Sequence, residues 1–425
     1  MAHIYLDYLD RKMALRGILL TSIAPLFLFA ADPSLAADEA KTLVEAITQG
    51  KANINFRYRY ENVDQDGFAE QANASTLRTK LKYATKPFKG FSGVIEFDNV
   101  TRIGAGNYNS TINGKGQFPV VADPQITAVN QAYIAYTGFK NTTLLAGRTA
   151  LNIDNQRFVG TVGFRQNDQT WDMAGIISKP TENLTLTGGY VWNVNRIFGD
   201  EHPFGDLDTN TFLLNSKYTG LALGNITAYG LFIDLNDAAV FGLSSQTLGV
   251  RFDGKHKFAN GNLTALYEAE FATQSDYKDS PLDYNAQYYH LSAGLSANGW
   301  TGKVGYEVLG SDNGIASFQT PLATLHKFNG WADKFLSTPA GGLQDFYGSL
   351  FYKFAGDSSV KGLTFGAIYH DFTADIGGDY GSEINLVVKK KIGKNYYGSL
   401  IFADYNASGF ATDTQKFWIT IGADF

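Results

Sequence analysis

The 425-residue chain contains no cysteine, which excludes a disulfide framework, a cysteine-ligated metal site and a cysteine nucleophile. Charged residues make up only 18% of the chain, below the roughly 25% of an average soluble protein. The net charge is −6 and no basic run is longer than three residues, so we expect no nucleic-acid partner. Proline is scarce, whereas aromatic residues reach 14%, and this aromatic content excludes a disordered chain.

The N-terminus has the layout of an export signal. A basic patch, an apolar stretch and a small-residue cleavage pattern follow one another: Arg11, Lys12 and Arg16, then residues 17–31, then Ser34, Leu35 and Ala36. We predict a signal peptide over residues 1–36 and a short periplasmic segment over residues 37–50. A membrane anchor is the alternative, but the apolar run is shorter than the roughly 20 residues that a spanning helix needs.

From residue 52 to the last residue, apolar and polar side chains alternate with period two. Ile54, Phe56 and Tyr58, for example, alternate with Asn55 and Arg57. These segments are about 10 to 13 residues long, the length with which a tilted strand crosses a bilayer, whereas strands of soluble sheets are mostly shorter. A polar face needs water and an apolar face needs lipid, and a closed barrel provides both without an unpaired edge.

We therefore predict an all-β fold over residues 51–425, a transmembrane antiparallel up-and-down β-barrel in the outer membrane of a Gram-negative bacterium. About 18 strands are expected, with 16 as the alternative count. The predicted strands cover residues 51–62, 74–86, 90–103, 127–138, 141–151, 168–178, 184–196, 209–219, 224–235, 245–257, 262–275, 285–297, 301–311, 342–355, 361–374, 380–392, 396–406 and 414–425.

The connections are asymmetric, with short turns at one end of the predicted barrel and long links at the other. The long links cover residues 104–126, 152–167, 197–208, 276–284 and 312–341. Short periplasmic turns and long outer loops are typical of outer-membrane barrels. The pattern leaves open whether the link 312–341 is a constriction, a plug or an outer lid. The terminal Phe425 ends an amphipathic strand, which resembles the signal that the barrel assembly machinery reads.

The sequence offers little for catalysis, because neither an HExxH motif nor a GxSxG nucleophile elbow is present. We predict that the protein is not an enzyme and has no cofactor and no metal site. His290 and His370 fall on predicted lumen faces, where we expect water-facing histidines rather than metal ligands.

Charges on the polar faces are the candidate functional residues, because charged rings set the ion preference of a pore. The candidate pore-lining residues are Arg57, Arg59, Arg78, Lys80, Lys82, Arg102, Arg148, Asp172, Arg251, Glu268, Glu270 and Glu383. The alternative for each is that it pairs across strands and stiffens the wall. Five of the bases lie on the first two predicted strands, with Glu61 as the only nearby acid. This basic cluster predicts attraction for carboxylate or phosphate solutes.

Several segments resemble the alginate export family of outer-membrane proteins over nearly the whole chain after the signal. The segments that carry the resemblance are Phe56–Glu61, Ala146–Arg148, Asn155–Gly160, Phe164–Asn167, Thr170–Asp172, His326–Phe335 and Gly381–Leu386. The resemblance implies a monomeric barrel of about 18 strands, and it implies lumen-facing positions for Arg57, Arg59, Arg148 and Asp172. The family's namesake exports a polyanionic polysaccharide through an electropositive lumen, whereas this chain has a net charge of −6 and mixes both signs on its predicted lumen face.

Three functional hypotheses follow from these patterns. The first is a porin, a channel for passive passage of hydrophilic, anionic solutes. The second is a dedicated exporter of an anionic polysaccharide such as alginate, and the third is a structural or adhesive barrel without an open pore. The expected partners are outer-membrane lipid, small hydrophilic solutes or a polyanionic polysaccharide, and the barrel assembly machinery, with the protein acting as a monomer.

Overall fold

The computed structural model describes residues 38–258, 261–356 and 358–425. The predicted signal peptide over residues 1–36 lies outside these residues. The described chain begins with the short helix α2 (Leu43–Thr48), whose N-cap Thr42 accepts a hydrogen bond from the backbone N–H of Glu45. No helix in the described residues is long and apolar enough to cross a membrane.

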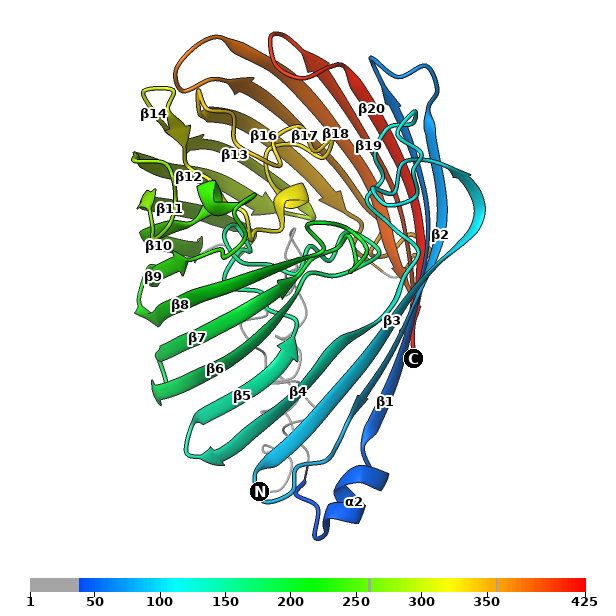
Figure 1. The fold of residues 1–425 in the computed structure, drawn as a ribbon, viewed down its shortest axis with the longest axis vertical. Coiled ribbons are helices and arrows are strands. Elements are labelled where there is room, and N and C mark those ends of the chain that lie inside the picture. Colours follow the sequence, from blue (N-terminus) through cyan, green and yellow to red (C-terminus); the bar gives the residue numbers. More distant parts are fainter. Residues whose placement is uncertain (1–37, 259–260, 357) are drawn as a thin grey trace.

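Eighteen strands form one closed antiparallel barrel (Figure 1). The strands are β1 (Lys51–Gln65), β2 (Ala72–Ala84), β3 (Phe91–Asn107), β4 (Thr127–Phe139), β5 (Thr142–Thr149), β6 (Thr170–Thr181), β7 (Leu184–Asn195), β8 (Asp206–Leu221), β9 (Gly224–Ile233), β10 (Ser245–Lys257), β11 (Leu263–Asp276), β12 (Asn285–Ala297), β13 (Trp300–Leu309), β16 (Leu343–Lys353), β17 (Thr364–Thr373), β18 (Asp379–Ile392), β19 (Tyr396–Ala407) and β20 (Thr414–Asp424). The barrel closes where β1 pairs with β20. The predicted fold class is confirmed, and the alternative count of 16 is wrong.

The remaining regular elements are small and lie in the connections. Strands β14 (Ser311–Asp312) and β15 (Ala316–Ser317) form a two-stranded ribbon, and two 3₁₀ turns cover Phe241–Leu243 and Leu325–Lys327. We call the end of the barrel with the short connections the turn end and the opposite end the loop end.

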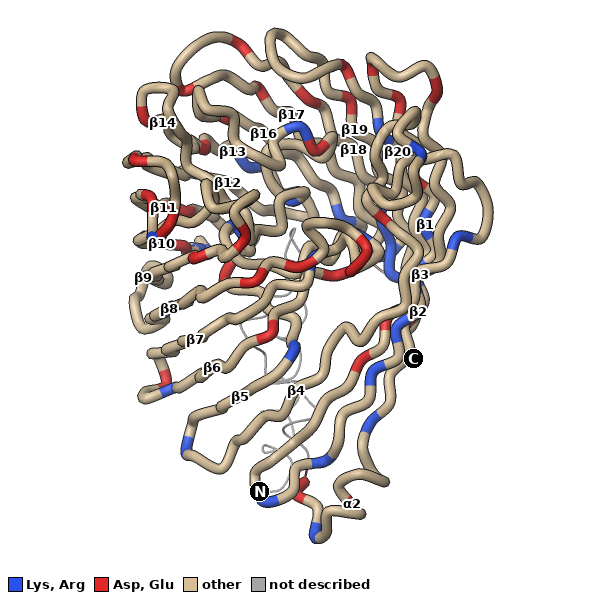
Figure 2. Tube along the Cα trace, in the orientation of Figure 1, with Lys and Arg blue, Asp and Glu red and all other residues tan. Residues whose placement is uncertain are grey.

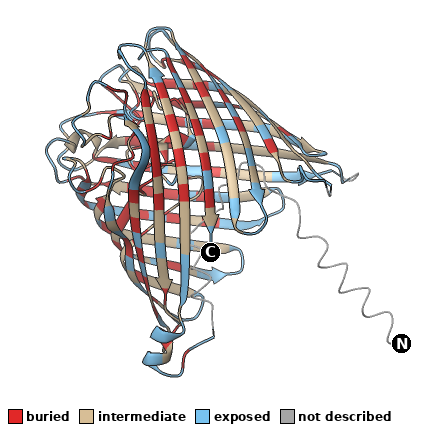
Figure 3. Cartoon of the chain, turned by 90° about the vertical axis from the view of Figure 1, so that its right-hand side faces the viewer, coloured by how far each residue is buried: buried red, intermediate tan, exposed pale blue. Residues whose placement is uncertain are grey.

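Burial follows the period-two pattern along the strands (Figure 3). In β8, Thr211 and Leu213 are buried on the inner face, whereas Phe212 and Leu214 are 49% and 55% exposed on the outer face. The exposed outer face carries Leu, Ile, Val and Phe on most strands, as a lipid-facing surface requires. The chain is therefore a transmembrane barrel of the outer-membrane type.

The lumen is not an open tube, because two long connections fold into it (Figure 1). Residues 150–169 join β5 to β6, and residues 310–342 join β13 to β16. Leu151 and Val159 from the first connection pack in one buried cluster with Phe318 and Leu322 from the second. The link that the sequence left open as constriction, plug or outer lid thus folds inward.

Candidate functional site in the lumen

The two inward connections are braced against each other, and together we call them the lumen bridge (residues 150–169 and 310–342). The backbone N–H of Gly160 donates to the carbonyl of Leu322 at 3.0 Å, and that of Thr324 donates to the carbonyl of Gln156 at 3.1 Å. The Gln169 amide also donates to the Leu322 carbonyl, at 3.2 Å. These hydrogen bonds join the two connections to each other, so we describe the bridge as one structural unit.

Arg57 and Arg59 of β1 hold the lumen bridge. The Arg57 guanidinium donates to the Gln166 side chain at 2.8 Å and to the carbonyl of Gly163 at 2.8 Å. Arg59 donates to the carbonyl of Phe164 and lies 4.1 Å from the centre of its ring. Both arginines are buried, at 7% and 3% exposure. Their donors are therefore used by backbone carbonyls and side chains of the protein itself.

Arg78 and Lys80 of β2 are neutralised by acids. Lys80 forms an ion pair with Asp168 of the lumen bridge and lies 3.5 Å from Glu96 and 3.7 Å from Asp98, and Arg78 lies 3.8 Å from Asp168. Burial alone would favour the protonated acid, but Lys80 and Arg78 hold the pKa of Asp168 below its ordinary value. The expectation that Glu61 is the only acid near this basic cluster is wrong.

A group of four side chains, which we call the latch, joins the lumen bridge to β20. Asp333 accepts from Arg165 at 3.2 Å and from Lys416 of β20 at 2.8 Å, and its other oxygen lies 2.7 Å from Nδ1 of His326. The His326 ring stacks on Phe164 with ring centres 3.6 Å apart. Burial lowers the pKa of His326, although Asp333 opposes this shift. The neutral imidazole is thus the form that the latch favours.

Arg165 also joins the latch to β1 through an ion pair with Glu61 at 2.8 Å. Glu61 is fully buried. Its carboxylate is therefore committed to the bridge instead of facing a solute.

A second polar network holds the bridge against the opposite wall. Arg157 forms an ion pair with Glu307 of β13 at 2.8 Å and donates to Asn329 at 3.1 Å. Asn329 in turn donates to Asp345 of β16 at 3.1 Å, and Asp345 lies 2.9 Å from Nδ1 of His370. His370 therefore takes part in bridge attachment and does not face water.

Glu383 of β18 completes this attachment, because its carboxylate accepts the backbone N–H groups of Trp331 and Ala332. Gly330 makes this approach possible. Its φ is +86°, and a Cβ atom there would lie 2.3 Å from the Glu383 carboxylate. The backbone conformation therefore favours glycine at this position, and a larger residue would also have to displace the Glu383 carboxylate.

Arg251, Glu268 and Glu270 lie on the inner faces of β10 and β11. The Arg251 Nε atom is 3.0 Å from Glu268 and 3.8 Å from Glu270. His290 of β12 lies beside them, 3.3 Å from Glu268. The structure therefore brings these three candidates and one histidine into a single charged group.

The structure does not place Arg148 and Asp172 in the lumen. They form a close ion pair at 2.7 Å, but they share the outer face with Ala146 and Ala174, which line an apolar groove on the lipid side. The β5–β6 register contains no bulge between these positions, so the period of two carries both side chains outward. The lumen-facing assignment of Arg148 and Asp172, made first from the predicted polar faces and then repeated by the resemblance, is wrong.

Two further candidates lie away from the bridge. Arg102 is exposed on the part of β3 near the loop end, and Lys82 is partly exposed toward the turn end of β2.

Four further lysines follow the same alternation. It predicts Lys303 and Lys389 on the lumen face, whereas Lys353 and Lys391 were not predicted there. Lys303, Lys353, Lys389 and Lys391 continue the inner-face positions of β13, β16 and β18 toward the turn end. In the described part of the chain, none of them forms an ion pair or a side-chain hydrogen bond. The inner-face residues that precede Lys353 and Lys391 at even spacing, Asp345 and Asn385, are the signal that could have identified these two.

Neither a protein-family profile nor a curated protein sequence matches the chain. Solved structures do match. OccK5 (OpdH) of Pseudomonas aeruginosa is 14% identical with a TM-score of 0.67, and the alignment covers 88% of this chain and 98% of that one. The outer membrane protein OpdK of Pseudomonas aeruginosa gives 14%, 0.68 and the same coverage, and OccAB2 of Acinetobacter baumannii gives 15%, 0.67 and the same coverage. None of these three carries the name of an alginate exporter, so the resemblance to that family stays a prediction. What the likeness shows is the closed-barrel fold of outer-membrane porins.

Proposed function

We propose that the protein is a porin, a passive outer-membrane channel for hydrophilic solutes with a preference for anions. The observation that carries this proposal is the set of inner-face lysines Lys303, Lys353, Lys389 and Lys391, which we call the lysine wall. Ammonium groups without protein partners keep their charge available to a passing solute, and enclosed walls of one sign raise the local concentration of counter-ions.

The lysine wall replaces the basic cluster of β1 and β2 as the basis of the anion preference. Lys353 and Lys389 both neighbour Thr364 of β17 in the strand register, which places them two strand spacings, roughly 10 Å, apart. A carboxylate or phosphate group at the turn end would meet both in succession, whereas Arg57 and Arg59 are occupied by the lumen bridge.

No observation favours the alternative, an exporter dedicated to an anionic polysaccharide such as alginate. A polymer needs a continuous passage, and the lumen bridge joins the walls on both sides of the barrel. The proposal keeps the expected partners. Outer-membrane lipid surrounds the barrel, the barrel assembly machinery inserts it, and the protein acts as a monomer.

The reversal potential of the purified barrel in a planar bilayer under a KCl gradient tests the function. We expect discrete channels and a reversal potential of the sign that chloride selectivity gives. The triple variant Lys303→Glu, Lys353→Glu, Lys389→Glu should move the potential toward the cation-selective sign.

Lys390→Glu is the matched control, because Lys390 lies between two members of the lysine wall but on the outer face, where it donates to the carbonyl of Ser359. It should leave the potential unchanged. An absence of channels would overturn the pore, and a cation-selective wild type would overturn the anion preference alone.

A further inference from the structure

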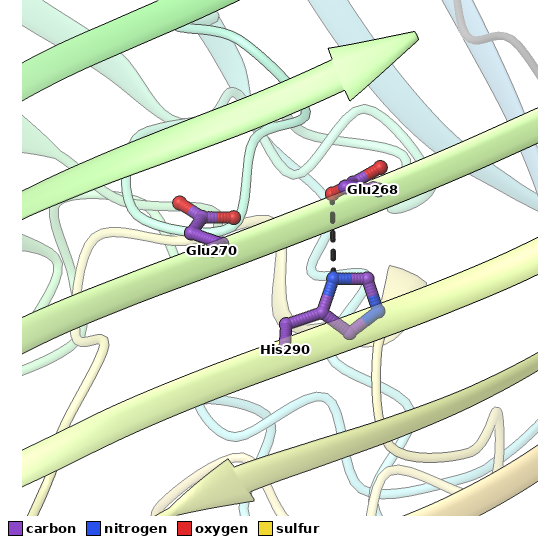
Figure 4. A group of neighbouring side chains, drawn as sticks. All are labelled: Glu268, Glu270 and His290. Carbon is purple, nitrogen blue, oxygen red and sulfur yellow. Dashed lines mark ion pairs between the residues drawn. The ribbon is translucent and has the colours of Figure 1, made fainter. Parts of the chain in front are cut away.

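Two carboxylates and one imidazole converge on the inner wall of the barrel (Figure 4). Glu268 and Glu270 of β11 and His290 of β12 each offer one ligand atom, and these three atoms all lie within 4.8 Å of one another. We propose that Glu268, Glu270 and His290 form a lumenal binding site for a divalent metal ion of the zinc class. Nitrogen and carboxylate oxygen are ligands that Zn²⁺ accepts in a three-residue site, with water in the fourth position.

Unpartnered buried atoms at the centre of the group support the site. Glu270 is 6% exposed and its Oε2 has no hydrogen-bond partner among the described residues, and Nδ1 of His290, which is 9% exposed, has none of suitable geometry. Buried polar atoms are normally satisfied, so such orphans require an explanation. A bound cation would satisfy both atoms.

The surrounding side chains hold the three ligands as a metal site requires. Nε2 of His290 lies 2.9 Å from the Tyr347 hydroxyl, and Oε1 of Glu270 accepts the Tyr229 hydroxyl at 2.8 Å. If the imidazole donates from Nε2 to Tyr347, the lone pair of Nδ1 points at the carboxylates. Outer partners of this kind fix the tautomer and orientation of metal ligands, and losing one typically weakens binding about 10- to 100-fold.

Arg251 competes with the metal. Its Nε atom lies 3.0 Å from Glu268 and 3.8 Å from Glu270, so the guanidinium shares the carboxylates that a metal would use. With His290 neutral, the two carboxylates and the Arg251 guanidinium together carry a net charge of −1, which still attracts a cation. Because Arg251 competes with the metal, two kinds of variant should have opposite effects. Removing a metal ligand should weaken metal binding, and removing Arg251 should strengthen it.

An ion can reach the site from the lumen. Glu268 is the most accessible of the three, with its side chain 16% exposed, and it faces Asn155 of the lumen bridge at 3.4 Å. A bound divalent ion would therefore add positive charge beside the bridge and alter ion flow past it.

Titration of ZnCl₂ into the detergent-purified barrel, prepared without a histidine tag, tests the site by calorimetry. We expect one Zn²⁺ per chain. Glu270→Gln and His290→Asn should each weaken the binding by tenfold or more, and Arg251→Gln should strengthen it. MgCl₂ should bind far more weakly, because Mg²⁺ prefers oxygen ligands in octahedral geometry.

His256→Asn is the matched control, since His256 is exposed on the outer face of β10. It should bind Zn²⁺ like the wild type, and far-ultraviolet circular dichroism should show each variant folded. Equal affinity of the wild type and His290→Asn, or equal affinity for Zn²⁺ and Mg²⁺, would overturn the site. Because the readout is binding, this result is independent of whether the channel prefers anions.

Discussion

Buried arginines fix the position of the lumen bridge inside the barrel. Arg157 is 1% exposed and bonds with Glu307, Thr320 and Asn329. A buried charge is tolerable only when its partners satisfy it, and each partner depends equally on the arginine. The guanidinium therefore determines where the bridge lies against β13.

Arg157→Met should release the bridge from that wall. Removing one partner of a buried ion pair typically costs about 3–5 kcal/mol, because the other charge is left uncompensated. We expect a larger single-channel conductance and faster proteolysis within residues 310–342. Arg102→Met, at an exposed guanidinium on β3, should change neither, and unchanged conductance in Arg157→Met would show that Arg157 does not hold the bridge.

At the scale of elements, the latch is the contact that depends on pH. Burial depresses the pKa of His326 below its ordinary value of 6.5. As the pH falls below 6.5, a His326 released from the latch takes up a proton, whereas the latched His326 stays neutral until the pH reaches its lower pKa. The stabilisation from the neutral latched histidine is fully present above pH 6.5 and is lost as the pH falls through the depressed pKa.

We therefore expect the bridge to loosen in acid, seen as larger current fluctuations in single-channel records at pH 5 than at pH 7.5. In His326→Gln, which cannot take up a proton, the difference between the two pH values should shrink. The same difference in the variant and the wild type would assign the acid effect to another group.

Strands could be predicted from the sequence because their signal is local. The predicted segments overlap all eighteen strands, although the alternation is weak near residues 130–136 and 400–404, and β10 and β12 begin and end at the predicted residues. Arg148 shows the limit of this signal, because its charge predicts a place on the lumen face, whereas its spacing from the lipid-facing Ala146 puts it on the outer face. The destination of residues 310–342 could not be predicted, because contacts such as Asp333 with Lys416 join positions far apart in sequence.

For the functional candidates, too, local features could be predicted from the sequence and long-range contacts could not. Arg57 and Lys80 were expected to face the lumen from their place in the alternation, but their partners Gln166 and Asp168 lie on a connection whose path no local pattern determines. The sequence thus predicts which residues face the inside of the barrel. It does not predict which of them are free to contact a solute, because that depends on where the connections fold.

Across the whole molecule, charge is segregated between the two ends of the barrel (Figure 2). Acids concentrate on the connections and strand ends at the loop end, for example Asp206, Asp208, Asp276, Asp279, Asp283 and Asp375. The turn end carries the lysine wall together with Lys255 of β10. The net charge of −6 therefore sums an acidic mouth and a basic vestibule.

A pore with an acidic and a basic half should rectify current. When the loop side is positive, cations enter through the acidic mouth and anions through the lysine wall, so ions accumulate where the halves meet; the reverse polarity depletes them. We expect currents of opposite polarity to differ by about twofold in 0.1 M KCl, where the Debye length is about 10 Å, and to become nearly equal in 1 M KCl, where it is about 3 Å. The triple lysine-to-glutamate variant makes both halves acidic and should abolish the asymmetry, while Lys390→Glu should keep it. Rectification that persists in 1 M KCl would instead assign the asymmetry to the shape of the pore.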